Sequence, residues 1–152
     1  MHIMTQEELE ETLQFQDYVT TLLHKIGWNL NCFASKKFNI EVGESLSRIE
    51  IKQDKRCKDT GNLYLEVKEM GSNGFVDSGI YRKDNALLIA IGDYDRVWVF
   101  VKKQLQGLVE KQAFRIVETE TSIGYLVPIE FIENNKNLVI VEFRNGEVVE
   151  SE

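Results

Sequence analysis

The residues from Ser47 to Lys68 read SRIEIKQDKRCKDTGNLYLEVK and decide the fold that we expect. Apolar and polar side chains alternate over 47–53 and again over 62–68, which is typical of β-strands with one buried face. The connection between them, 54–61, is polar and ends in Gly61. The pattern predicts a β-hairpin with a long connection.

Candidate chemistry lies at the ends of these two strands. Asp54 follows the first strand, and Glu66 and Lys68 are two residues apart on the second, so we expect them to share a face. The hairpin would bring Asp54 beside them. Two carboxylates, assisted by the Val67 carbonyl, could hold Mg²⁺ (or Mn²⁺), and Lys68 could orient a water or stabilise charge on a phosphate.

Other interpretations of the same residues stay open. Glu50 or Asp59 could be the first acid in place of Asp54. Glu66 and Lys68 could instead form an ion pair on an exposed strand, an arrangement that contributes little stability.

The order of Asp54, Glu66 and Lys68 resembles the PD-(D/E)XK, or restriction-endonuclease-like, nucleases. Small phage- and bacterial-type members carry a TGN element before the acid-bearing strand, as at 60–62 here. The segments 78–80 and 124–128 are also similar to theirs. The resemblance covers about 15–130 and is dense over 47–92. It implies a restriction-endonuclease-like core, a mixed β-sheet with flanking helices.

The resemblance also implies a further site residue on the first helix. Many relatives carry a glutamate there that contributes to the metal site, and Gln16 stands at that position. Gln16 could hold a metal-bound water, or Asp17 could substitute for it.

The remaining pattern predicts a single α/β domain around one mixed sheet. Thr5 and Glu8 have the spacing of a capping box that opens a helix over 6–26. The core is expected over 28–143, followed by an acidic hairpin and tail over 144–152. The expected strands are 28–34, 86–91, 96–101, 114–117 and 138–143, the expected short helices are 105–111 and 128–131, and 70–79 is expected to be a mobile loop.

Charge bears on the partner. The net charge is −7, but 47–68 holds six basic and four acidic residues, a local excess of +2. A local basic patch can attract a polyanion. We expect the DNA backbone to meet Lys52, Lys55, Arg56 and Lys58. A domain this small contacts little duplex, so we expect a homodimer or higher homo-oligomer.

Composition excludes several other classes. No apolar run approaches the ~20 residues that span a bilayer, and the first residues lack a signal-peptide pattern, so we expect a cytoplasmic protein without a membrane partner. Cys32 and Cys57 have no zinc-site spacing and are expected to be reduced, partly buried small residues.

We therefore expect a metal-dependent endodeoxyribonuclease, either site-specific (homing or restriction type) or structure-specific (junction resolving). The alternatives are a catalytically inactive DNA- or protein-binding module of the same fold and a small acidic interaction protein.

Overall fold

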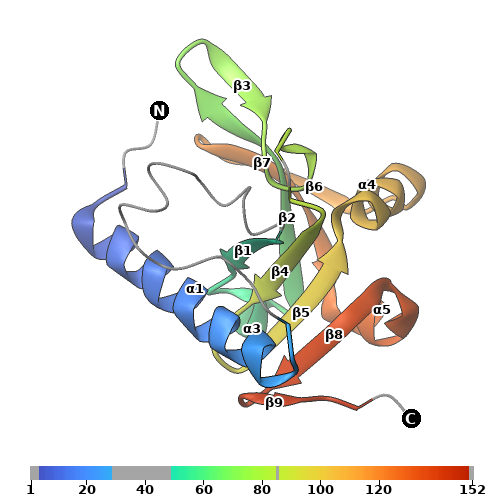
Figure 1. Ribbon diagram of the computed structural model, residues 1–152. Coiled ribbons are helices and arrows are strands. Elements are labelled where there is room, and N and C mark those ends of the chain that lie inside the picture. The colour runs from blue at the N-terminus through green and yellow to red at the C-terminus, as the bar shows by residue number, and fades with distance from the viewer. Residues whose placement is uncertain (1–3, 29–48, 85, 151–152) are drawn as a thin grey trace.

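The computed structural model describes residues 4–28, 49–84 and 86–150 of the chain, which form an α/β domain. Three layers are stacked: helix α1 (Gln6–Lys25), a five-stranded mixed sheet, and a four-stranded antiparallel sheet. Helix α1 lies across the outer face of the five-stranded sheet (Figure 1). The prediction of an α/β fold with a mixed sheet is confirmed, but a second sheet accompanies it.

Helix α1 begins and packs as its sequence predicts. The Thr5 hydroxyl accepts a hydrogen bond from the Glu8 backbone N–H at 3.1 Å, which caps the first turn. The apolar stripe of the helix, including Phe15, Val19 and Leu23, packs on Ile49 and Ile51 of the sheet below. Burial of each such side chain contributes about 1.5–3 kcal/mol.

The five-stranded sheet has the order β1-β4-β5-β8-β9. Strands β1 and β4 are parallel, and the other neighbours are antiparallel. The strands are β1 (Ile49–Gln53), β4 (Leu88–Gly92), β5 (Arg96–Val101), β8 (Val139–Arg144) and β9 (Glu147–Val148).

The four-stranded sheet has the order β3-β2-β7-β6. Its strands are β2 (Asn62–Gly71), β3 (Gly74–Asp77), β6 (Arg115–Glu118) and β7 (Ser122–Pro128). The short elements are helices α3 (Cys57–Thr60), α4 (Lys102–Lys111) and α5 (Ile129–Glu133), and 3-10 turns η2 (Gly79–Tyr81) and η3 (Lys136–Leu138).

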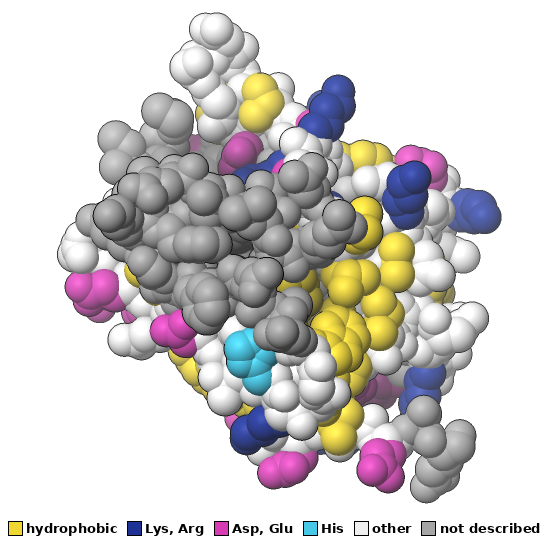
Figure 2. Space-filling view, in the orientation of Figure 1, with side chains coloured by type: hydrophobic (Ala, Val, Ile, Leu, Met, Phe, Trp, Pro, Cys, Tyr) yellow, Lys and Arg dark blue, Asp and Glu magenta, His cyan; other side chains and the backbone are white. Residues whose placement is uncertain are grey.

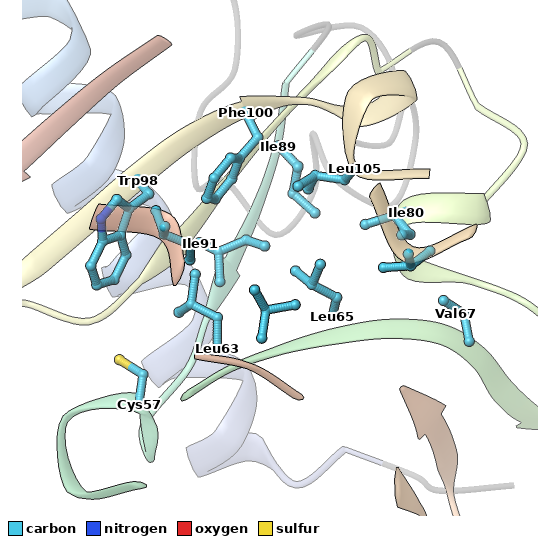
Figure 3. Packing of buried hydrophobic residues seen from close by; sticks show 13 residues of the cluster. Cys57, Leu63, Leu65, Val67, Ile80, Ile89, Ile91, Trp98, Phe100 and Leu105 are labelled. Carbon is cyan, nitrogen blue, oxygen red and sulfur yellow. The ribbon is translucent and has the colours of Figure 1, made fainter. Parts of the chain in front are cut away.

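The main core lies between the two sheets. Leu63 and Leu65 of β2 point at Ile89 and Ile91 of β4 (Figure 3), and all four are almost fully buried. Cys57 of α3 closes one end of this core. Strand β2 therefore has one buried face, as its alternation predicts, and an opposite face that is available for polar side chains.

The predicted hairpin between the first two strands is wrong. Strand β1 pairs in parallel with β4, while β2 pairs with β3 and β7 in the other sheet. Both strands bury an apolar face, but they bury it against different partners: Ile49 and Ile51 face α1, and Leu63 and Leu65 face the inter-sheet core. The alternation of apolar and polar residues indicates that one face of a strand is buried, but it does not indicate which element covers that face.

Two further predictions need correction. The region 70–79, expected to be a mobile loop, contains the end of β2, a tight turn and strand β3. Strand β7 was not predicted, although its Val127 is buried in the main core. The strands and short helices expected between 86 and 149 otherwise agree within a few residues with β4, β5, α4, β6, α5, β8 and β9. The expected strand 28–34 and Cys32 lie outside the described residues, apart from Trp28.

Candidate active site

Asp54 is tied to the strand that carries Glu66. Its Oδ2 accepts a hydrogen bond from the Tyr64 backbone N–H at 2.9 Å, and its Oδ1 accepts one from the Arg56 N–H at 3.1 Å. The Asp54 N–H in turn donates to the Gly92 carbonyl at 2.7 Å. One residue thus links the end of β1, the end of β4 and the start of β2. Asp54 approaches β2 as expected. The contact is a hydrogen bond of the Asp54 side chain, because β1 and β2 are not paired as neighbouring strands.

Glu66 lies on the same face of β2 as Tyr64, away from the inter-sheet core. It is opposite Gly124 of β7 in the ladder. The Tyr64 ring packs over that glycine, where an added Cβ would be 2.5 Å from the ring. Burial raises the pKa of Tyr64, and the Glu66 charge raises it further, whereas the hydrogen bond with Ser122 opposes the shift. The Glu66 Oε2 accepts a hydrogen bond from the Ser78 hydroxyl at 2.9 Å.

Lys68 does not share that face. The β2–β7 register shifts between Glu66 and Lys68, which are opposite Gly124 and Ile123 respectively. Adjacent residues of β7 face opposite sides of the sheet, so the bulge at Val67 places Glu66 and Lys68 on opposite sides. The expectation that they share a face is therefore wrong. Lys68 forms an ion pair with Asp77 of β3, with 3.5 Å between Nζ and Oδ1.

Gln16 occupies the buried side of α1. It is only 3% exposed, whereas the neighbouring Asp17 is exposed to solvent. Helix α1 passes near the connection after β1, since Glu11 forms an ion pair with Lys55.

Two of the four basic residues expected to hold DNA, Lys55 and Lys58, have acidic partners that the sequence did not reveal. Besides the Lys55–Glu11 pair, Lys58 Nζ lies 2.8 Å from Asp95 Oδ2. The hydrogen bonds to these carboxylates raise the pKa of both lysines. Acidic and basic side chains are mixed over the described part of the face seen in Figure 2. The excess of basic charge counted over 47–68 is therefore reduced in the folded protein, because Glu11 and Asp95 from other segments lie beside two of its lysines.

The two rival acids lie in different surroundings. Asp59 is exposed in helix α3. Glu50 is 1% exposed on β1, and its carboxylate lies 3.7 Å from the Arg82 guanidinium. Arg82 also approaches Glu69 of β2 at 3.6 Å. Arg82 thus links one carboxylate from each sheet, a role that its position in the sequence did not indicate.

The donor chemistry fits a small divalent cation. Asp54 and Glu66 supply hard carboxylate oxygens, and Mg²⁺ commonly takes one or two carboxylates together with water and substrate oxygens. Over 4–28, 49–84 and 86–150, no group of three or more His, Cys, Asp or Glu side chains is arranged to hold a metal. The Val67 carbonyl, proposed as a further ligand, accepts a hydrogen bond from the Ser78 N–H at 3.0 Å.

A cavity of about 580 Å³ opens beside the connection that carries Asp54. Cys57, Asp93 and Trp98 line it, and Arg96 and Arg144 are among its charged residues. The Arg96 guanidinium stacks over the Trp98 ring, 4.5 Å from its centroid. Burial raises the pKa of Cys57 to about 12, and the charges of Asp93 and Asp54 add to this shift, so the thiol stays protonated near neutral pH.

Comparisons with known proteins identify no relative of this chain: no family model, curated protein or solved structure matches it. No helix within the described parts of the chain is long and apolar enough to cross a membrane.

Proposed function

We propose that this protein is a metal-dependent endodeoxyribonuclease in which Asp54 and Glu66 bind Mg²⁺ or Mn²⁺. The observation that carries the proposal is the hydrogen bond from the Tyr64 N–H to Asp54, because it fixes the first acid to the strand that presents Glu66. Tyr64 and Glu66 share one face of that strand, two residues apart.

The hydrogen-bond partners of these carboxylates support cation binding. Asp54 accepts from two backbone N–H groups and Glu66 from a serine hydroxyl, which are neutral donors. Within the described residues, neither forms an ion pair with a lysine or arginine, so their negative charge is not compensated there. A bound Mg²⁺ would polarise a phosphate and lower the pKa of a bound water. DNA is the proposed substrate and a homodimer or higher oligomer the proposed assembly.

The proposal is tested by cleavage of supercoiled and linear DNA in Mg²⁺, Mn²⁺ or EDTA. We expect metal-dependent cutting by the wild-type protein, loss of cutting in Glu66→Gln, and retained cutting in Glu69→Gln. The control alters an acid on the same strand that is paired with Arg82. No cutting of any substrate, combined with no metal binding in calorimetry, would contradict the proposal.

A second candidate follows from Lys68. Its ion pair with Asp77, and its position across the sheet from Glu66, favour a binding module that lacks catalysis. Lys68→Ala separates the candidates when tested in the same assay. Loss of cutting with unchanged metal affinity would assign Lys68 to catalysis. In that case Lys68 would have to move toward Glu66 when DNA binds. A wild-type protein that binds DNA without cutting it, and a variant that binds equally well, would support the binding module.

A further inference from the structure

Ser78 is fully buried at 0% exposure, between β3 and η2. It makes two hydrogen bonds to the part of β2 around the bulge. The Ser78 hydroxyl donates to Glu66 Oε2 at 2.9 Å, and the Ser78 backbone N–H donates to the Val67 carbonyl at 3.0 Å. A buried hydroxyl costs free energy unless it is hydrogen-bonded, and here its partner is the candidate metal ligand.

The next two residues restrict the movement of Ser78. Gly79 has a φ of +56°, and a Cβ there would lie 2.0 Å from the Glu66 carbonyl oxygen. Only glycine fits this close approach of backbone to backbone. Ile80 is 0% exposed and packs in the inter-sheet core, near Val67 in Figure 3. The backbone on both sides of Ser78 is therefore held against β2.

This arrangement has a consequence for the Glu66 carboxylate. The Ser78 hydroxyl engages Oε2, which restricts rotation of the side chain, and within the described residues no hydrogen bond to Oε1 is found. A hydrogen bond from a neutral donor orients the carboxylate without compensating its charge, unlike an ion pair with an arginine or a lysine.

We infer that Ser78 is a positioning residue that holds Glu66 in the orientation needed for metal binding; this inference rests on the proposed function. Loss of a hydrogen bond to a metal ligand typically lowers metal affinity about 10–100-fold. Ser78→Ala should therefore weaken Mn²⁺ binding by at least about tenfold, with the fold retained.

The experiment is a calorimetric Mn²⁺ titration of the full chain, wild type and three variants. Ser78→Ala removes the hydroxyl, and Ser78→Thr restores it on an extended backbone that suits a β-branched residue (φ −152°, ψ −176°). Ser122→Ala is the matched control, since its hydroxyl is bonded to the Tyr64 hydroxyl and not to a carboxylate. We expect weaker binding for Ser78→Ala alone.

DNA cleavage at increasing Mn²⁺ distinguishes positioning from a general structural role. A positioning role predicts that Ser78→Ala approaches the wild-type rate once Mn²⁺ saturates it, whereas a damaged fold would not be rescued by metal. Equal Mn²⁺ affinity of wild type and Ser78→Ala would overturn the inference and leave the proposed function intact. A wild-type protein that neither binds Mn²⁺ nor cuts DNA would overturn both.

Discussion

Two groups of carboxylates in this protein are held in opposite ways. Asp54 and Glu66 accept hydrogen bonds from backbone N–H groups and a serine hydroxyl. Glu133 and Glu142, near the cavity, are paired with Arg96 at 3.0 and 3.2 Å, and Arg144 adds a second cation to Glu142 at 3.1 Å. Within the described residues, the first group has no cationic partner, whereas the second group is paired with arginines.

The difference separates a candidate binding site from structural polar contacts. A carboxylate that is already paired with arginine has little to gain from a metal ion, because the cation would have to replace the guanidinium. A carboxylate oriented by neutral donors keeps its attraction for an external cation. Removal of charge from the two groups should therefore affect different properties.

The largest effect is expected for Asp54→Asn. The variant loses the negative charge and also one of the two oxygens that accept backbone N–H bonds. Metal binding should therefore fail, and the DNA cleavage rate should fall about a thousandfold, equivalent to roughly 4 kcal/mol. Single-turnover cleavage in Mn²⁺ measures this. An unchanged rate would show that the neutral-donor group is no more functional than the arginine-paired one.

A smaller effect, on stability and not on metal binding, is expected for Glu142→Gln. The Glu142 side chain is 17% exposed and Arg96 is 22% exposed, so the guanidinium would lose a partly buried partner. We expect the free energy of unfolding to fall by about 1–3 kcal/mol, measured by urea denaturation. Mn²⁺ affinity should remain that of the wild type. A loss of affinity in a folded variant would contradict the assignment of Glu142 to structural contacts alone.

The smallest effect concerns Cys57, which lines the cavity. Because burial raises its pKa from 9.0 to about 12, folding favours the neutral thiol. The resulting stabilisation is fully present below pH 9 and is lost as the pH rises toward 12. The free energy of unfolding should fall by less than about 1.5 kcal/mol between pH 8 and pH 10. Urea denaturation of the wild type and Cys57→Ala tests this, and an identical pH dependence in both would contradict it.

Local patterns predicted much of the secondary structure. The Thr5 cap and the apolar stripe located α1, and the alternation over 62–68 identified the buried face of β2. The hairpin expected over 144–152 turns at Asn145 and Gly146, which adopt φ values of 52° and 81° as this residue pair favours. These features depend on residues that are close in the sequence, so the local sequence is sufficient to predict them.

The candidate site could be predicted only in part. Asp54 comes to β2 as expected, but period-2 alternation placed Lys68 beside Glu66, and a bulge reverses that relationship. A bulge adds one residue to one strand, and no residue between Glu66 and Lys68 marks it in the sequence. Ser78, Arg82 and the acidic partners of Lys55 and Lys58 were also missed, because each contact joins segments distant in the chain.

The sequence by itself determined where the helices and most strands form, which faces are apolar, and that acids and a lysine gather between Asp54 and Lys68. Only the tertiary structure decided that β1 and β2 belong to different sheets, that Glu66 is held by a buried serine, and that Lys68 turns toward Asp77. The physical reason is that local propensity and periodicity act over a few residues. Strand partners, bulges and ion pairs depend instead on how distant segments pack.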